Sequence, residues 1–357
     1  MLPPLSKGNK TEIIVSAEIN SITDIDQMAM TFLGDITLTI EWTDWRIKFK
    51  DLKENGNYLN KYWQNEIWLP PLYFSNTIGN VPILIDDSKT VKVLRQGESI
   101  YNDVSELNEG HIFSGEENGL QLKTQYEQTF KCLFELSKFP FDTQYCTMNI
   151  KIPHEIRNYT QLKTKVLTYS GSSNNLYLLI NQVFKHYPYY SGKKVLQQFN
   201  LVNPHFGLNE KGIKLEVAFT LQRNPSSLFI NAYIPSFFIM MTTIMPLFLD
   251  ERMHFTTSIM LVLTSQLCLY TLFQSSLQDM PKTEYLKHID FWNMFVMTVS
   301  LTNFFTLFLW EILQYKEVKK TIKRIMSIAI PFITLIGVVS YWITAGILYY
   351  GSIIKSA

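Results

Sequence analysis

The pattern of apolar and polar residues in this chain changes near residue 225. Before that point, short runs such as 12–19 and 35–42 alternate between apolar and polar positions, and clusters rich in Asn and Gly separate the runs. Alternation with period two, in stretches rich in β-branched residues, is typical of strands that bury one face. Many short strands separated by turns favour an all-β sandwich. Residues 1–225 are therefore predicted to form an immunoglobulin-like sandwich of about ten strands.

Beyond residue 225 the chain contains four long apolar stretches. They lie at about 228–249, 253–273, 289–313 and 327–350, and each reaches the roughly 20 residues that a helix needs to cross a bilayer. The alternative is a set of buried helices in a large soluble protein. It is disfavoured because four such runs in so short a segment leave no polar surface to cover them. We therefore expect residues 226–357 to form a four-helix transmembrane bundle.

The distribution of charge predicts how this bundle is oriented. The short linker 314–326 is rich in basic residues, which places it in the cytoplasm. Counting spans from there puts both the N-terminal domain and the C-terminus outside the cell, in a protein of the plasma membrane. Glycosylation sequons at Asn9 and Asn158 agree with an extracellular domain. No secretory leader precedes the polar residues after Pro4, so we expect the numbering of a mature chain.

Composition and motifs narrow the function classes. The formal net charge is +1, which gives no bulk attraction for nucleic acid. The sequence has no Gly-rich phosphate loop, no HExxH motif and no close cluster of Cys and His. We therefore expect neither an enzyme nor a bound cofactor.

Several motifs occur in a characteristic order. Cys132 and Cys146 lie 14 positions apart and enclose Phe139-Pro140-Phe141-Asp142. The motifs Trp42-Thr43-Asp44 and Trp68-Leu69-Pro70-Pro71 precede them, and Tyr233-Ile234-Pro235-Ser236 stands in the first apolar stretch. Together they resemble the pentameric Cys-loop ligand-gated ion channels, over essentially the whole chain. The likeness is to an invertebrate-type subunit close to the nicotinic-like, cation-selective branch, although Pro71 replaces an acid that is usual in the family.

This resemblance implies a disulfide between Cys132 and Cys146. The enclosed loop is then either a simple staple of a β-hairpin or a stiff apolar knuckle, built from Phe139 and Pro140, that rests on the membrane helices. The family also carries residues that couple the two domains, and the matching positions here are Asp24, Asp26, Asp142, Arg223 and Pro281. Each of these carboxylates could equally be a solvated loop charge.

The resemblance also places a small-molecule site between adjoining subunits. Members that bind acetylcholine-like amines surround the cation with aromatic rings. This chain has Thr37, Ser75 and Pro153 at three of the usual aromatic positions. The remaining candidates lie in the expected loop tip 203–209 or in a shifted register, and they are His205, Phe206, Tyr73 and Phe74. We therefore expect an unknown small-molecule ligand that is not a quaternary amine.

The second apolar stretch is rich in hydroxyl groups. Steps of four and three residues trace one helical face, which consists of His254, Ser258, Leu261, Ser265, Cys268 and Leu272. Polar residues in a bilayer helix are costly unless they face water or one another. Five copies of this face around an axis would make a hydrated pore with a constriction at Leu261. The alternative is a polar seam that holds helices of the bundle together.

The start of this stretch predicts the selectivity of the pore. A ring of Glu251 carboxylates at the cytoplasmic mouth would attract cations, whereas anion-selective members carry a Pro-Ala pair before the arginine that matches Arg252. A ring of His254 imidazoles could titrate near neutral pH or bind a divalent metal. The alternative is an ordinary narrow neutral ring at His254.

The sequence thus favours a subunit of a pentameric cation channel in the lipid bilayer, gated by an extracellular ligand. A homopentamer is expected, and a heteromer is possible. The alternative is an orphan or accessory subunit that assembles but is not gated alone. A membrane enzyme or transporter has neither a catalytic constellation nor a helix-breaking repeat to support it.

Overall fold

The computed structural model describes residues 2–5, 10–60, 62, 66–79, 84–85, 90–99, 111–164, 189–190, 192, 196, 198–208, 212–248, 255–278, 283–312 and 316–356. The chain divides into two compact units. The first comprises 1–133, 145–196 and 201–220, and the second comprises 134–144, 197–200 and 221–357. The interior of the loop between Cys132 and Cys146 therefore belongs to the same unit as the helices.

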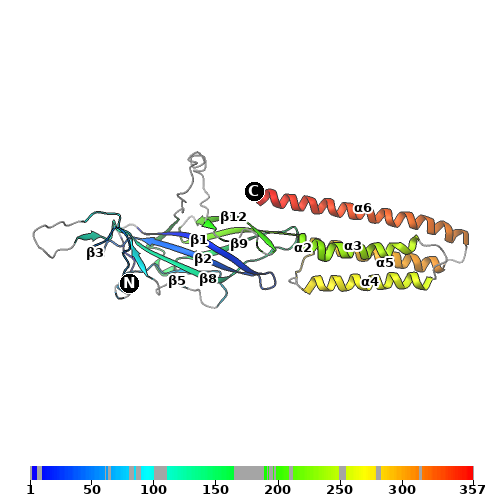
Figure 1. Cartoon of the computed structure of the whole chain (residues 1–357), viewed down its shortest axis with the longest axis horizontal. Coiled ribbons are helices and arrows are strands. Elements are labelled where there is room, and N and C mark those ends of the chain that lie inside the picture. Colours follow the sequence, from blue (N-terminus) through cyan, green and yellow to red (C-terminus); the bar gives the residue numbers. More distant parts are fainter. Residues whose placement is uncertain are drawn as a thin grey trace, which may run out of the picture. The chain divides into compact units, whose positions relative to one another are not determined.

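Strands make up the first unit and extend into the second (Figure 1). Their bounds are β1 Thr11–Asp26, β2 Thr31–Trp42, β3 Lys48–Lys50, β4 Leu72–Phe74, β5 Leu84–Ile85, β6 Val91–Val93, β7 Ile112–Ser114, β8 Leu120–Lys131, β9 Thr143–Lys151, β10 Thr160–Thr164, β11 Tyr189–Tyr190, β12 Phe199–Leu208 and β13 Lys214–Arg223. A short 3-10 turn, η1 at His154–Ile156, precedes β10.

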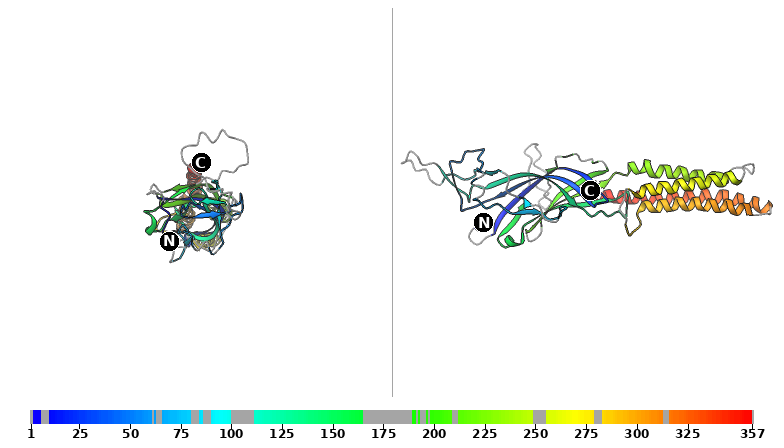
Figure 2. Two further views of the ribbon diagram at one scale, coloured as in Figure 1. Left: turned by 90° about the vertical axis from the view of Figure 1, so that its left-hand side faces the viewer. Right: turned by 90° about the horizontal axis from the view of Figure 1, so that it is seen from below.

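These strands form two main sheets. One has the order β10-β1-β2-β8-β6, with β11 pairing β1 at Glu18 and Ile19, and the other has the order β12-β13-β9-β4-β5. Strand β1 pairs β2 antiparallel and β10 parallel, and its register with β2 shifts between Ile19 and Ser21 and again between Thr23 and Asp26. The right-hand view of Figure 2 shows the long blue strands β1 and β2 bending along the unit. The predicted all-β sandwich is confirmed.

The alternation seen in the sequence is the alternation of burial. In β2, Phe32, Ile36, Leu38 and Ile40 are buried while the intervening side chains are partly exposed. Rings from three strands meet between the sheets, where Phe32 lies 5.2 Å from Phe219 and 5.5 Å from Phe130 between ring centroids. Close packing of this kind excludes water and fixes the strand register, because a one-residue slip would expose every buried side chain.

Four helical segments follow and all are long and apolar enough to cross a membrane. The first is continuous through α2 Ser226–Leu228, η2 Phe229–Tyr233, α3 Ile234–Ile244 and η3 Met245–Leu247. The others are α4 Phe255–Gln278, α5 His288–Ile312 and α6 Lys316–Ser356. The predicted spans thus agree with the observed ones within a few residues, except at the start of the fourth.

The fourth helix begins earlier than predicted. The sequence placed a linker at 314–326, but α6 is already helical at Lys316. Lys and Arg are good helix formers, so the basic cluster extends the helix instead of interrupting it. Further along, Gly337 faces α5, because an added Cβ would overlap the Phe295 ring. A glycine at this position therefore lets the two helices approach closely.

Candidate functional site

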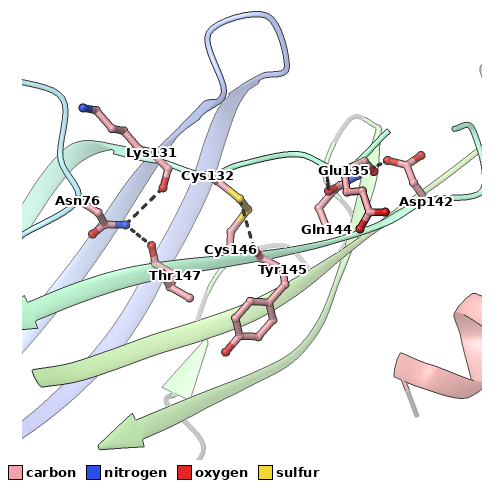
Figure 3. The surroundings of a disulfide bond; sticks show 9 residues. All are labelled: Asn76, Lys131, Cys132, Glu135, Asp142, Gln144, Tyr145, Cys146 and Thr147. Carbon is pink, nitrogen blue, oxygen red and sulfur yellow. Dashed lines mark hydrogen bonds between the residues drawn. A yellow bond between two sulfur atoms is a disulfide. The ribbon is translucent and has the colours of Figure 1, made fainter. Parts of the chain in front are cut away.

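The predicted disulfide is present. Cys132 and Cys146 are bonded across a sequence separation of 14, with their Cα atoms 5.3 Å apart (Figure 3). Next to it, the Asn76 amide donates hydrogen bonds to the carbonyl oxygens of Thr147 at 2.6 Å and Lys131 at 3.4 Å. The disulfide and this amide together tie the end of β8 to β9.

An ion pair anchors the interior of the disulfide loop to the last strand. Arg223, the final residue of β13, donates from Nε to Asp142 Oδ1 at 2.7 Å and from Nη2 to Asp142 Oδ2 at 3.1 Å. Both side chains are only 2% exposed. The guanidinium also lies over two rings, 4.6 Å from the centroid of Phe139 and 4.5 Å from that of Phe199. Removing one partner of such a buried pair leaves an uncompensated charge, at a cost of about 3–5 kcal/mol.

The same loop lies against the start of α5. The first backbone N–H groups of this helix have no partner within the helix, and two of them donate to the loop. His288 N donates to Ser137 O at 3.0 Å, and Ile289 N donates to Phe139 O at 3.2 Å. The Phe141 ring adds an edge contact to the His288 ring, 5.8 Å between centroids. Within the second unit, the loop therefore caps the N-terminus of α5.

The other predicted coupling residues are Asp24, Asp26 and Pro281. Asp24 and Asp26 are exposed at the end of β1, in the first unit. The Asp26 carboxylate accepts the backbone N–H groups of Met28 and Ala29, at 2.7 and 3.1 Å, so it stabilises the β1–β2 turn. Pro281 lies outside the described residues. The coupling role of these three residues stays a prediction.

Two of the predicted pore residues face the interior of the bundle instead. Ser258 and Ser265 are each 7% exposed, on the same side of α4 as the buried Val262. Ser265 Oγ lies 3.1 Å from Thr242 Oγ1 of α3, at hydrogen-bonding distance. Leu272 is half-buried and borders the space between α3, α4 and α5. This burial favours the alternative, a polar seam between helices, at these positions, and their role in a pore stays a prediction.

A neighbouring stripe of α4 is exposed and rich in hydroxyl groups. It follows the same steps of four and three residues and consists of Thr257, Leu261, Thr264, Cys268, Thr271 and Ser275. Only Leu261 and Cys268 were in the predicted face. The hydroxyls of Thr264, Thr271 and Ser275 donate to carbonyl oxygens of their own helix at 2.8–2.9 Å. We call this set the α4 stripe. Glu251 and His254, at the predicted cytoplasmic mouth, lie outside the described residues.

The predicted ligand residues are distributed over both sheets of the first unit. Thr37 is in β2, and its Oγ1 accepts a hydrogen bond from Asn20 Nδ2 at 2.9 Å. Tyr73 and Phe74 are in β4, Ser75 follows them, and Pro153 precedes η1. The Phe74 ring is fully buried, 5.3 Å from the Phe130 ring centroid, so it belongs to the core and not to a ligand wall. That the others meet across an interface between subunits stays a prediction.

The expected loop tip at 203–209 is mostly strand. Residues 199–208 form β12, so His205 and Phe206 lie within a strand and the turn to β13 falls later in the chain. The resemblance placed a loop tip here, but pairing with β13 continues the strand to Leu208. Strand β12 turns the His205 side chain towards β9, where its Nε2 lies 3.4 Å from Tyr145 OH.

Tyr145 is at the centre of a polar cluster that the sequence did not reveal. Its hydroxyl donates to Glu216 Oε1 at 3.4 Å, and Lys214 Nζ lies 2.8 Å from Glu216 Oε2. Burial and the nearby Glu216 carboxylate raise the pKa of the Tyr145 phenol. The members come from β9, β12 and β13, so no local sequence signal could have joined them.

A second feature missed by the sequence is a series of polar contacts made by the first membrane helix. Trp292 Nε1 of α5 donates to Ser236 Oγ at 2.9 Å, and Asn303 Nδ2 of α5 donates to Thr243 Oγ1 at 3.3 Å. Tyr233 OH lies 2.8 Å from Tyr341 OH of α6. Together with the contact between Thr242 and Ser265, these pairs link the first span to each of the other three helices.

Comparisons with known proteins agree with this arrangement. The neurotransmitter-gated ion-channel ligand binding domain family matches residues 1–225. A protein of Drosophila melanogaster named "Glutamate-gated chloride channel" is 23% identical over 282 residues, which cover 77% of this chain and 53% of that protein. The chain thus spans about half the length of the curated relative it matches.

Proposed function

This chain belongs to the family of neurotransmitter-gated ion channels, and from that premise we propose that it is one subunit of a homopentameric channel opened by an extracellular ligand. The family consists of ion channels and not of enzymes, as the sequence predicted. Members of the family form pentamers, and four helices able to span a membrane fit a channel of the plasma membrane.

The observation that carries the proposal is the anchoring of the disulfide loop. The loop is bound by Arg223 at the end of the last strand, and its carbonyl oxygens cap α5. Strand β13 continues after two residues into the first membrane span, and α5 follows the α4 stripe in the chain. A ligand that shifts β13 or the loop would therefore act on the two helices that neighbour α4 in the chain, the first span before it and α5 after it. Two discrete arrangements of this loop would provide the coupling between ligand and pore.

The α4 stripe is our proposed pore lining. Side chains that line a shared axis must be exposed in the single subunit, which favours this stripe over Ser258 and Ser265. The hydroxyls of Thr264, Thr271 and Ser275 donate their hydrogens to the helix backbone, so their lone pairs remain able to accept contacts from water or a cation. Leu261 is the apolar member in the cytoplasmic half of the stripe, and five copies would form a constriction that closes by dewetting.

We propose that this pore conducts cations. The sequence places Asp250-Glu251 directly before Arg252, and a ring of Glu251 carboxylates would raise the local cation concentration. The relative named as a glutamate-gated chloride channel favours the second candidate, anion conduction. This relative gives no support to the expected nicotinic-like branch, so selectivity has to be measured directly.

The decisive experiment is recording from cells that express only this chain. We expect current on application of one member of a panel of amino acids, amines and protons. Dilution of external NaCl should shift the reversal potential towards negative values, as for a cation pore, and Glu251→Ala should reduce that shift. A shift in the opposite direction would establish anion conduction. A stable pentamer that stays silent even with Leu261→Thr would identify the chain as an accessory subunit.

Two further features of topology belong to the same proposal. Asn158 is exposed directly after η1 and should carry a glycan, whereas Asn9 lies outside the described residues. A tag after α6 should be accessible to antibody on intact cells, because a chain that enters the membrane from outside and crosses it four times ends outside. Asn158→Gln should lose the glycan-dependent shift in electrophoretic mobility, which checks the first expectation. Antibody labelling of the tag on intact cells checks the second.

A further inference from the structure

An open cleft of about 470 Å³ lies in the first unit, at one end of the sheet that contains β1 and β2. Its polar lining comes from several strands and their ends, and consists of Glu12, Glu41, Thr43, Gln96, Lys163 and Thr164. None of these residues was among the predicted ligand positions. A volume of this size falls in the range of small-molecule sites, about 300–1,000 Å³.

Strand pairing fixes the order of charges along the floor of the cleft. Ile14 pairs with Glu41 of β2 on one side and with Lys163 of β10 on the other. The three residues thus form one row across three strands, with a carboxylate at one end, an ammonium at the other and an aliphatic side chain between them. Because neighbouring strands are about 4.8 Å apart, the backbones of Glu41 and Lys163 are separated by about 10 Å.

The two charged ends are held differently. Glu41 Oε1 accepts a hydrogen bond from Gln121 Nε2 at 2.8 Å, which orients the carboxylate on the sheet surface. Lys163 forms an ion pair with Glu12, but both side chains are about half exposed, at 49% and 52%. An exposed ion pair is weakly held and exchanges with other partners. A second carboxylate can therefore replace Glu12 at Lys163 without loss of a buried contact.

We propose that this cleft binds a small zwitterion whose ammonium and carboxylate are separated by a chain of methylene groups. The ligand's ammonium contacts Glu41, its carboxylate contacts Lys163, and its methylene chain lies on Ile14. A simple anion is disfavoured because two carboxylates line the cleft, and a simple cation leaves Lys163 unused. The cleft is formed by one chain, and its occupancy does not depend on the proposed channel function.

Binding to the purified full-length protein in lipid nanodiscs tests this inference without any ion flow. The probe is 6-aminohexanoate, and hexylamine and hexanoate each carry one of its two charges. Isothermal titration should show saturable binding of 6-aminohexanoate, weaker binding of hexylamine and no binding of hexanoate. Loss of one charge-assisted hydrogen bond corresponds to about tenfold in affinity, so Glu41→Gln and Lys163→Gln should each weaken binding by about that factor.

The matched control is Glu127→Gln. Glu127 pairs with Asp35, far along the same sheet from the cleft, so this variant removes an equal charge and should leave the affinity unchanged. Size-exclusion profiles of all variants establish that they fold and assemble alike. If either cleft variant fails to assemble, Thr43→Val replaces it. Absence of saturable binding, equal binding of hexylamine and 6-aminohexanoate, or equal loss in Glu127→Gln would each overturn the proposal.

Discussion

Two sets of polar side chains in the second unit are arranged in opposite ways. One set is buried and paired between different segments, as in Arg223 with Asp142 and Ser236 with Trp292. The other set is the α4 stripe, which is exposed; its Thr264, Thr271 and Ser275 hydroxyls donate to the backbone of their own helix. The first set joins segments that are far apart in the sequence. Among the described residues, these hydrogen bonds of the second set stay within one helix.

This difference indicates which polar residues stabilise the chain and which remain available for function. A buried polar group without a partner costs free energy, so each member of the first set constrains the geometry of its partner. An exposed hydroxyl on an apolar helix has no such role in a single subunit. In a membrane it would be costly unless water or another chain contacts it, which is why we assign the α4 stripe to the pore.

The largest effect is expected from the buried ion pair. Asp142→Ala should reduce the free energy of unfolding by about 3–5 kcal/mol, because Arg223 would remain buried and unpaired. Thermal unfolding of the purified protein measures the loss. The double variant Asp142→Leu with Arg223→Leu should recover part of the stability, since it removes both charges. Wild-type stability in Asp142→Ala would show that the pair does not anchor the loop.

A smaller loss is expected from the contacts of the first span. Ser236→Ala removes the acceptor of Trp292 Nε1, which is buried, and should cost about 1–3 kcal/mol. Thr298→Ala is the control, because its hydroxyl is exposed and donates to Met294 O of its own helix. Chemical unfolding in detergent compares the two variants. Equal effects would contradict the distinction between buried and exposed polar groups.

The two faces of α4 can be compared without unfolding the protein. In a Cys268→Ser background, cysteines at 257, 264 and 271 should react with a water-soluble thiol reagent at least about tenfold faster than cysteines at 258 and 265. The reason is that Ser258 and Ser265 face α3 and the bundle interior. Labelling of assembled protein followed by mass spectrometry gives the rates. Faster reaction at 258 and 265 would restore the pore face that the sequence predicted.

The smallest effect concerns Tyr145, whose hydroxyl is only partly buried. Burial and Glu216 both raise the pKa of its phenol, so Glu216→Gln should lower that pKa while leaving it above its ordinary value. Because the pKa of Tyr145 is higher in the folded protein than in the unfolded chain, its neutral phenol stabilises the fold at pH values below the unfolded-state pKa. This contribution is lost as the pH rises through the folded-state pKa. NMR titration of a labelled Tyr145 measures the shift, and Glu155→Gln is the control. An unchanged pKa in Glu216→Gln would exclude the electrostatic contribution.

The sequence alone determined the architecture because its strongest signals are local. Alternation with period two identified the sandwich, and length and composition identified the four spans. The order of motifs around Cys132 and Cys146 identified the family and hence the disulfide. The basic residues from Lys316 were misread as a linker, because charge suggests exposure but does not by itself end a helix.

The tertiary structure decided which side chains meet. Helix α4 has hydroxyls on more than one face, so periodicity could not distinguish Ser265, which contacts Thr242 of α3, from the exposed Thr264. His205 was expected in a loop, but pairing of β12 placed it beside Tyr145. The cleft at Glu41 and Lys163 arises from strands more than 100 residues apart in the chain. Burial and pairing depend on neighbours that are distant in sequence, and a local pattern carries no information about them.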